Sequence, residues 1–142
     1  GVKGIGLKGD DKVKGIVVVD KNATLLTVCK NGFGKRTDYS EYSVQRRSGQ
    51  GVINIKTTDR NGKVVALINV SDDNELMMMT AQGMIIRAAI NTIRSIGRNT
   101  QGVKLISLKA GDKVVSVAPV IGEDEEETEG TETDEAGSEQ TE

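Results

Sequence analysis

The residues with the clearest chemical potential form one short segment, Gln45 to Gly51, with the sequence Gln-Arg-Arg-Ser-Gly-Gln-Gly. A guanidinium group presents a fixed fork of donors that fits phosphate oxygens. Glycine allows positive φ and lets the backbone approach a ligand closely. An apolar run, 52–55, follows directly. We interpret the segment as a tight cationic loop that leads into a strand; an ordinary basic turn is the alternative interpretation.

The chain repeats around this loop with an offset of 50 or 51 residues. Two dipeptides recur in this way: Gly1-Val2 as Gly51-Val52 and Gly102-Val103, and Lys12-Val13 as Lys63-Val64 and Lys113-Val114. At the same spacing Arg47 aligns with Arg98, and Gln50 aligns with Gln101. The repeat divides the chain into copy 1 (1–50), copy 2 (51–101), a partial copy 3 (102–122) and a tail (123–142).

Each copy is expected to form four short strands, since short runs rich in β-branched residues alternate with turn residues. In copies 1 and 2 the first strand covers 2–7 and 52–55, the second 13–19 and 64–70, and the third 24–29 and 75–80, while the fourth begins at Phe33 and Met84. Val17 to Val19 are expected to be buried. Asn31-Gly32 suits a primed hairpin turn. The pattern predicts an all-β repeat architecture.

The charge of the chain is strongly divided. Residues 1–122 hold all 19 Lys and Arg against 10 Asp and Glu, a net charge of +9, and the last 20 residues hold 11 acids and no base. A basic body suits the duplex phosphate backbone, and three aromatic residues are too few for a single-strand stacking platform. We expect the tail to be disordered and hypothesise that it competes with DNA for the body.

Little in the sequence supports catalysis. There is no histidine and one cysteine, so we expect no catalytic residue, no metal site, no cofactor and no intrachain disulfide. Cys29 is expected in the core, and Tyr39 and Tyr42 in or beside strands. No apolar run is long enough to span a membrane, and no signal peptide is recognisable. A cytoplasmic setting without a membrane partner is therefore expected.

The predicted DNA-contacting residues are the polar side chains of the loop and of the fourth strands. They are Lys35, Arg36, Gln45, Arg46, Arg47, Gln50, Arg87 and Arg98, with Gly49, Gly51 and Gly102 as the structural glycines of the loops. If the copies stand side by side, equivalent cations fall in a row and form a track for double-stranded DNA.

Repeat, loop and strand pattern together resemble the C-terminal domain of the A subunit of DNA gyrase. That family carries a Gln-Arg-Arg-Gly-Gly-Lys-Gly box, and residues 45–51 match five of its seven positions, with Ser48 and Gln50 as the departures. In copy 2, residues 96–102 keep only Arg98 and Gly102. Gly1 takes the place of a box's last glycine, so a further copy is expected before it.

The resemblance implies a β-pinwheel, a propeller-like ring of four-stranded blades, of which this chain holds the last two and a segment that closes the ring. It implies DNA wrapping that supports negative supercoiling by an ATP-dependent type II topoisomerase, with the gyrase B subunit, together with the rest of the A subunit, as partners. It places the catalytic tyrosine elsewhere in the A subunit. The alternatives are the corresponding domain of topoisomerase IV and, from another class, a propeller-type protein-interaction module.

Overall fold

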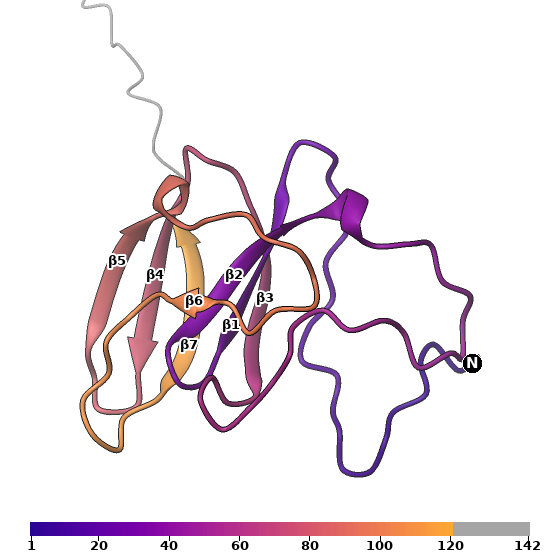
Figure 1. The fold of residues 1–142 in the computed structure, drawn as a ribbon, viewed down its shortest axis with the longest axis horizontal. Coiled ribbons are helices and arrows are strands. Elements are labelled where there is room, and N and C mark those ends of the chain that lie inside the picture. The colour runs from indigo at the N-terminus through magenta and orange to yellow at the C-terminus, as the bar shows by residue number, and fades with distance from the viewer. Residues whose placement is uncertain (121–142) are drawn as a thin grey trace, which may run out of the picture.

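The computed structural model describes residues 1–120, so the predictions for the tail lie outside the described residues. Two antiparallel sheets stand side by side (Figure 1). The first sheet has the order β3 (Val64–Val70), β1 (Thr24–Cys29), β2 (Phe33–Asp38) and β6 (Val103–Lys104). The second sheet has the order β5 (Ile85–Ala89), β4 (Glu75–Thr80) and β7 (Val114–Val120). Two single-turn 3-10 helices, η1 (Tyr39–Glu41) and η2 (Ile90–Thr92), follow β2 and β5.

Each sheet takes strands from successive copies. The third strand of copy 1, β1, pairs with the second strand of copy 2, β3, from Thr24↔Val70 to Cys29↔Val64. The third strand of copy 2, β4, pairs in the same way with β7 of copy 3, from Glu75↔Val120 to Thr80↔Val114. Both ladders have an irregularity at the equivalent last pair. The unit that repeats in sequence is therefore not the unit that forms one sheet.

The first strand follows a longer rule. Strand β6 belongs to copy 3 and pairs with the fourth strand of copy 1, β2, through Phe33↔Lys104 and Gly34↔Val103. The first strand of copy 3 thus pairs with a strand of copy 1, two copies earlier. The second strands of copies 2 and 3 each pair with a strand of the copy directly before. The same spacing gives 2–7, 13–19 and 52–55 no pairing partner within residues 1–120.

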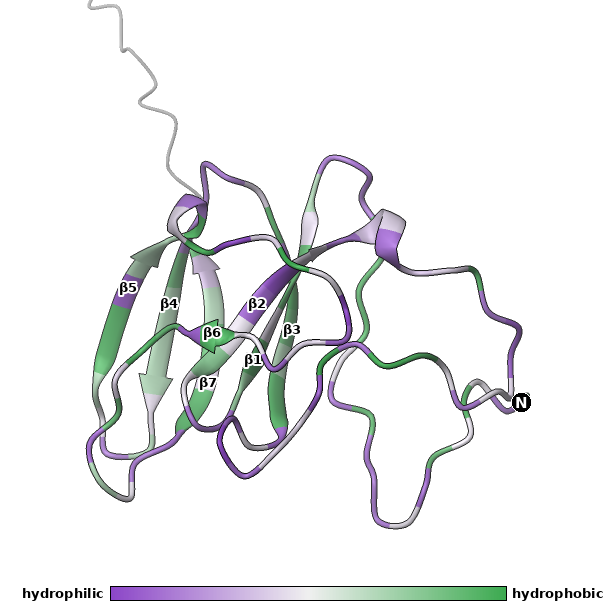
Figure 2. Cartoon of the chain, viewed as in Figure 1, coloured by the Kyte–Doolittle hydropathy of each residue, from purple (hydrophilic) through white to green (hydrophobic). Residues whose placement is uncertain are grey.

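These three segments form no strand, and the strand predictions for them were wrong. The expected burial of Val17 to Val19 was also wrong, because Val18 is 86% and Val19 61% exposed. An isolated strand leaves its backbone groups without ladder partners, so β-propensity alone does not create one. Apolar stretches of these segments therefore lie outside both sheets (Figure 2).

The predicted β1, β3 and β4 agree with the structure residue for residue, and the fourth strands begin at or next to the expected positions. The β1–β2 turn differs in type. Gly32 has φ 84°, Asn31 is not in the positive-φ region, and Gly32 N donates to Cys29 O at 3.1 Å. The turn therefore lacks the second positive φ that a type I′ turn requires.

The main core lies between the sheets and takes side chains from both. Leu26, Val28 and Val70 come from the first sheet, and Leu76, Met78 and Val114 from the second. Along β4, Met78 is fully buried, whereas Met77 and Met79 are 37% and 41% exposed, as the period of two of a strand requires.

Cys29 lies in the core, as expected, in a second and smaller cluster. It packs there with Phe33 and Ile55. Burial raises the pKa of its thiol to about 11. The thiol is therefore protonated at neutral pH.

Candidate nucleic-acid interface

The loop at 45–51 is exposed along its whole length and is held from one side by the N-terminal segment. Gly6 N donates to Gly49 O at 2.7 Å, and Ser48 N donates to Gly4 O at 2.8 Å. Ser48, with φ 68°, also donates from Oγ to Lys3 O at 3.0 Å. The backbone of the loop is thus fixed by bonds to 3–6.

The polar side chains of this loop remain exposed. Gln45 Nε2 donates to the nearby Ser43 Oγ at 2.8 Å. Neither Arg46 nor Arg47 bonds to any other described residue, and Gln50 is exposed as well. Val2, Lys3 and residues 45–48 line one shallow hollow. These four predicted site residues are therefore accessible to a ligand.

Lys35 is different, because it is completely buried in β2. Its Nζ donates to Gly97 O at 2.7 Å, to Arg98 O at 2.5 Å and to Thr100 Oγ1 at 3.3 Å. Burial, followed by the nearby Arg98 charge, lowers the pKa of the ammonium to about 8. The lysine fixes loop 96–102, and its complete burial argues against the predicted contact with DNA.

Arg36 is also buried in β2, on the opposite face from Lys35. Its Nη1 donates to Asp72 Oδ1 at 2.5 Å and to Ile90 O at 3.4 Å. Strand β2 is thus the hydrophilic strand of its sheet, although all but its last residue is buried (Figure 2). These bonds compensate the burial of its charge only in part, because Arg36 Nε is buried without a hydrogen-bond partner among residues 1–120, and the guanidinium is largely shielded from a surface ligand.

The two arginines predicted in copy 2 already have partners. Arg98 Nε donates to Glu41 O at 2.6 Å and its Nη1 donates to Ile53 O at 2.8 Å, while the guanidinium lies 5.9 Å from the Tyr42 ring centroid. Arg87 Nε donates to Glu75 Oε2 at 2.5 Å across the β4–β5 pair. The expected row of fourth-strand cations is therefore largely engaged within the protein.

A different row of cations lies where the strands of both sheets meet their turns. We call this boundary the turn edge and define it by the segments 8–14, 30–32, 56–63 and 104–113. Backbone bonds of 2.9 Å place three lysines along this edge: Lys30 N donates to Lys63 O, the N of Val114, next to Lys113, donates to Lys30 O, and Lys113 O accepts from Ala81 N. The side chains of Lys30, Lys63 and Lys113 are all exposed.

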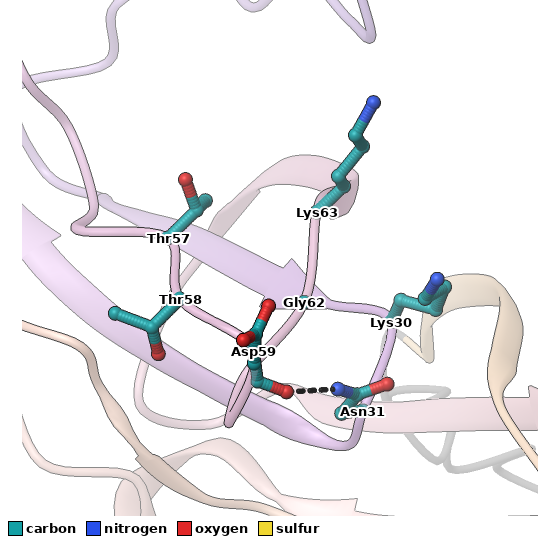
Figure 3. Close-up of a pocket in the computed structure, with 7 residues that line it drawn as sticks. All are labelled: Lys30, Asn31, Thr57, Thr58, Asp59, Gly62 and Lys63. Carbon is teal, nitrogen blue, oxygen red and sulfur yellow. Dashed lines mark hydrogen bonds between the residues drawn. The ribbon is translucent and has the colours of Figure 1, made fainter.

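Adjoining hollows connect this row with copy 1. Lys30, Thr58 and Lys63 line one hollow, together with the Asp59 carboxylate (Figure 3). A second hollow shares Lys63 with the first and adds Lys12 and Lys14. A third shares Lys12 and is also lined by Lys8 and Gln50. These adjoining hollows form a shallow surface that runs along the turn edge to the loop at 45–51, and Asp10, Asp11 and Asp59 line it together with the more numerous cations.

The opposite ends of the strands carry mainly acids. Asp38 begins η1 there, and Asp72 and Asp73 lie in the turn between β3 and β4. Lys21 and Arg94 are exposed cations on this opposite edge. The molecule is therefore electrically polarised along its strands, and the turn edge is its basic side.

Sequence reasoning missed the turn-edge lysines as site residues. The signal was present in the recurring Lys-Val dipeptide, which places Lys12, Lys63 and Lys113 at equivalent positions. On sequence alone this dipeptide marks the repeat. In copies 2 and 3 it also marks the residue immediately before a second strand, where a side chain lies at the turn edge.

Two absences hold within residues 1–120. In that range no three His, Cys, Asp or Glu side chains gather into a group able to hold a metal ion. None of the helices described there has the length and apolar character needed to cross a membrane.

A β-sheet unit that repeats along the chain is characteristic of propeller-like domains, and the comparisons with known proteins specify which family this one belongs to. The family model of the DNA gyrase C-terminal domain, a beta-propeller, matches residues 1–20, 23–71 and 74–121. The chain belongs to this family.

Relatives and solved structures agree with that membership. The DNA gyrase A subunit of Salmonella typhimurium is 45% identical over 120 residues, and that of Escherichia coli 42% over 127. A structure of the DNA gyrase A C-terminal domain matches 72% of this chain and 35% of its own, at 31% identity and a TM-score of 0.67. The C-terminal domain of DNA topoisomerase IV shares the fold, with a TM-score of 0.76 and 20% identity, over 84% of this chain and 38% of its own.

The chain corresponds to a small part of those relatives. It matches 84% and 89% of its own length in the two gyrase proteins, but only 14% of theirs. The matched units 23–71 and 74–121 each begin just before a third strand and end after the next copy's second strand. They therefore coincide with the strands that pair in space rather than with the copies defined from the loop.

Proposed function

We propose that this chain binds double-stranded DNA through its phosphate backbone, without sequence preference, as the C-terminal part of a DNA gyrase A subunit. There it would help to wrap DNA for negative supercoiling by an ATP-dependent type II topoisomerase. The observation that carries the proposal is the continuous row of exposed cations along the turn edge. Family membership supports the same function.

The geometry favours backbone contacts over base recognition. Ammonium groups at equivalent positions of successive copies offer point charges at intervals, and phosphates bind such charges in any sequence. The hollows are shallow, and the turn edge described here has no exposed aromatic side chain for stacking on unpaired bases, since Phe33 is buried against Arg60 and Lys104. Duplex DNA lying along this edge fits these features best.

The proposed contact residues differ from those the sequence predicts. From the loop we retain Gln45, Arg46 and Gln50, and we add Lys12, Lys30, Lys63 and Lys113 from the turn edge. Lys35, Arg36 and Arg98 serve the fold through the bonds described above. Arg87 is exposed but forms a salt bridge with Glu75. Arg47 is not retained, because its counterpart in copy 2, Arg98, serves the fold.

The proposal includes the partners of the complete enzyme: the rest of the A subunit, and the B subunit, which would supply ATP hydrolysis. The chain would act as a non-catalytic DNA-binding part of the enzyme and would need no cofactor of its own. The corresponding domain of topoisomerase IV is the second candidate, because it shares the fold. Higher identity to gyrase relatives favours gyrase.

The salt dependence of duplex binding by the full chain tests the proposal. We expect equal affinity for three duplexes of unrelated sequence. A plot of log Kd against log salt concentration should have a slope of roughly 4.5, from about 0.9 for each of the five proposed cations. A protein-interaction module has no reason to hold random DNA. Salt-independent binding, or a strong preference for one duplex, would contradict the proposal.

A further inference from the structure

The two adjacent arginines of the 45–51 loop occupy different positions in the repeat. At the offset of 51 residues Arg47 corresponds to Arg98, whereas Arg46 corresponds to Gly97. Copy 2 therefore keeps the second arginine and lacks the first. The contacts of Arg98 show what the second arginine does when the preceding copy lies beside its loop.

Arg98 closes its loop onto two other segments. One acceptor, Ile53 O, lies at the start of its own copy, and the other, Glu41 O, lies in η1, which follows the fourth strand of the preceding copy. A bidentate guanidinium suits this arrangement because its two N–H groups diverge in a fixed plane. The clamp holds copy 2 against copy 1.

A carbonyl group equivalent to one acceptor of the clamp lies beside the loop that carries Arg47. At the 50-residue offset the counterpart of Ile53 is Lys3, whose carbonyl oxygen lies at the loop and accepts from Ser48 Oγ at 3.0 Å. Backbone bonds on the two loops also correspond, since Gly6 N donates to Gly49 O and Lys56 N donates to Thr100 O. The other acceptor of the clamp would come from the segment that follows a preceding copy's fourth strand.

Gly51 supports the same conclusion independently. Gly51 and Gly102 both have φ 76°. A Cβ atom on Gly102 would meet Gly34 O of the neighbouring strand at 2.6 Å, whereas one on Gly51 would meet only Ile5 Cδ1, at 3.7 Å. The loop of copy 1 thus has the backbone shape required by a neighbouring fourth strand, with no such strand beside it in the described residues.

We infer that Arg47 is a positioning residue that clamps the loop onto a preceding copy, and that Arg46 is the phosphate-binding arginine of the pair. Adjacent arginines in the same exposed loop thus have separate roles. Arg46 corresponds to Gly97 of copy 2, a position with open space around it. A Cβ atom on Gly97 would have Glu41 Oε2 as its nearest neighbour, at 3.7 Å. The guanidinium of Arg46 therefore remains available to DNA.

The inference rests on the proposed place of this chain in a DNA gyrase A subunit, so the test uses the full-length protein in complex with the gyrase B subunit. The variants are Arg46→Ala, Arg47→Ala and Arg47→Lys, with Arg98→Ala as the calibrating clamp and Arg94→Ala as an exposed control. Three quantities are measured: the salt slope of duplex binding, the unfolding midpoint of the domain, and hydrogen exchange at the amides of Gly6 and Ser48.

We expect Arg46→Ala to lower the magnitude of the salt slope by about 0.9 and to leave the unfolding midpoint unchanged. Arg47→Ala and Arg47→Lys should keep the slope and accelerate exchange at the two amides several-fold. They should also lower the unfolding midpoint by about 2–4 °C, the effect that we expect for Arg98→Ala as well. A lower slope in Arg47→Ala, or an unchanged midpoint and exchange, overturns the inference. Failure of the wild-type protein to bind duplex DNA refutes the proposed function instead.

Discussion

At the scale of single residues, the environment of a cation decides whether it serves the fold or the surface. Lys35 lies in β2 and Lys63 directly before β3 of the same sheet, yet one is fully buried under three acceptors and the other is exposed at the turn edge. The sequence indicates that both are cationic. It does not indicate which side chain a later loop covers, because loop 96–102 lies more than 60 residues from Lys35 along the chain.

The buried ammonium of Lys35 predicts an unusual pH dependence of stability. Its pKa is about 8 in the folded protein and about 10.4 in an unfolded chain. Between these values the unfolded chain binds the proton that the folded protein releases, so stability rises with pH. We expect the free energy of unfolding of the wild type to increase by about 1–3 kcal/mol relative to Lys35→Met between pH 8 and 10.

Urea unfolding at several pH values measures this difference, with Lys21→Met as the control for loss of one exposed charge. A wild-type curve that stays parallel to the Lys35→Met curve across this range would show that the ammonium remains protonated in the folded protein. The three acceptors around Nζ would then outweigh its desolvation.

At the scale of elements, the sequence predicts the strands whose partners lie within the chain. β1, β3 and β4 were predicted with correct bounds because their β-branched or apolar runs pair across successive copies. Residues 2–7 and 13–19 carry comparable apolar patterns and form no strand. An apolar pattern indicates that a segment can form a strand, but the strand also needs a neighbouring strand to pair with. The sequence repeat alone did not reveal that the first strand of a copy pairs with a strand two copies earlier.

Gly102 and Gly111 have nearly the same φ, so alanine substitutions at the two positions distinguish the cost of close packing from the cost of backbone strain. Gly102 and Gly111 have φ 76° and 75°, but only Gly102 lies against a neighbouring strand, at Gly34. We expect Gly111→Ala to lower the free energy of unfolding by about 1 kcal/mol, and Gly102→Ala by about 2–4 kcal/mol, because the added methyl group must also displace β2 or β6. Urea unfolding measures both, and equal losses would contradict the close packing of β6 on β2.

At the scale of the whole molecule, charge is arranged along the strands as well as along the sequence. The body has a net charge of +9 before the acidic tail begins, and its exposed lysines gather at the turn edge. The sequence predicts the basic body and its role, but it predicted the track on the fourth strands. Only the folded arrangement shows that the cations there are buried or engaged, and that the edge carries the exposed row.

The acidic tail gives a prediction at this scale. The last described strand, β7, begins at the turn edge with Val114 and ends with Val120 beside Glu75, about 20 Å away along the strand. The sequence predicts a disordered tail, and a disordered chain of 20 residues has an r.m.s. end-to-end distance of about 25 Å, enough to return to the edge. Truncation after Gly122 should therefore tighten duplex binding at low salt, with a gain that shrinks as salt rises. Equal affinity of both chains at low salt would contradict this hypothesis.

The central claim is that DNA lies along the turn edge, and a comparison of two double variants of the full chain tests it most directly. Lys63→Ala/Lys113→Ala removes two cations from the turn edge, and Lys21→Ala/Arg94→Ala removes two exposed cations from the opposite edge. Both lower the net charge equally. The account predicts that the turn-edge pair lowers the magnitude of the salt slope of duplex binding by about 1.8 while the opposite pair leaves it unchanged. Equal effects of the two pairs, or a larger effect of the opposite pair, would contradict it.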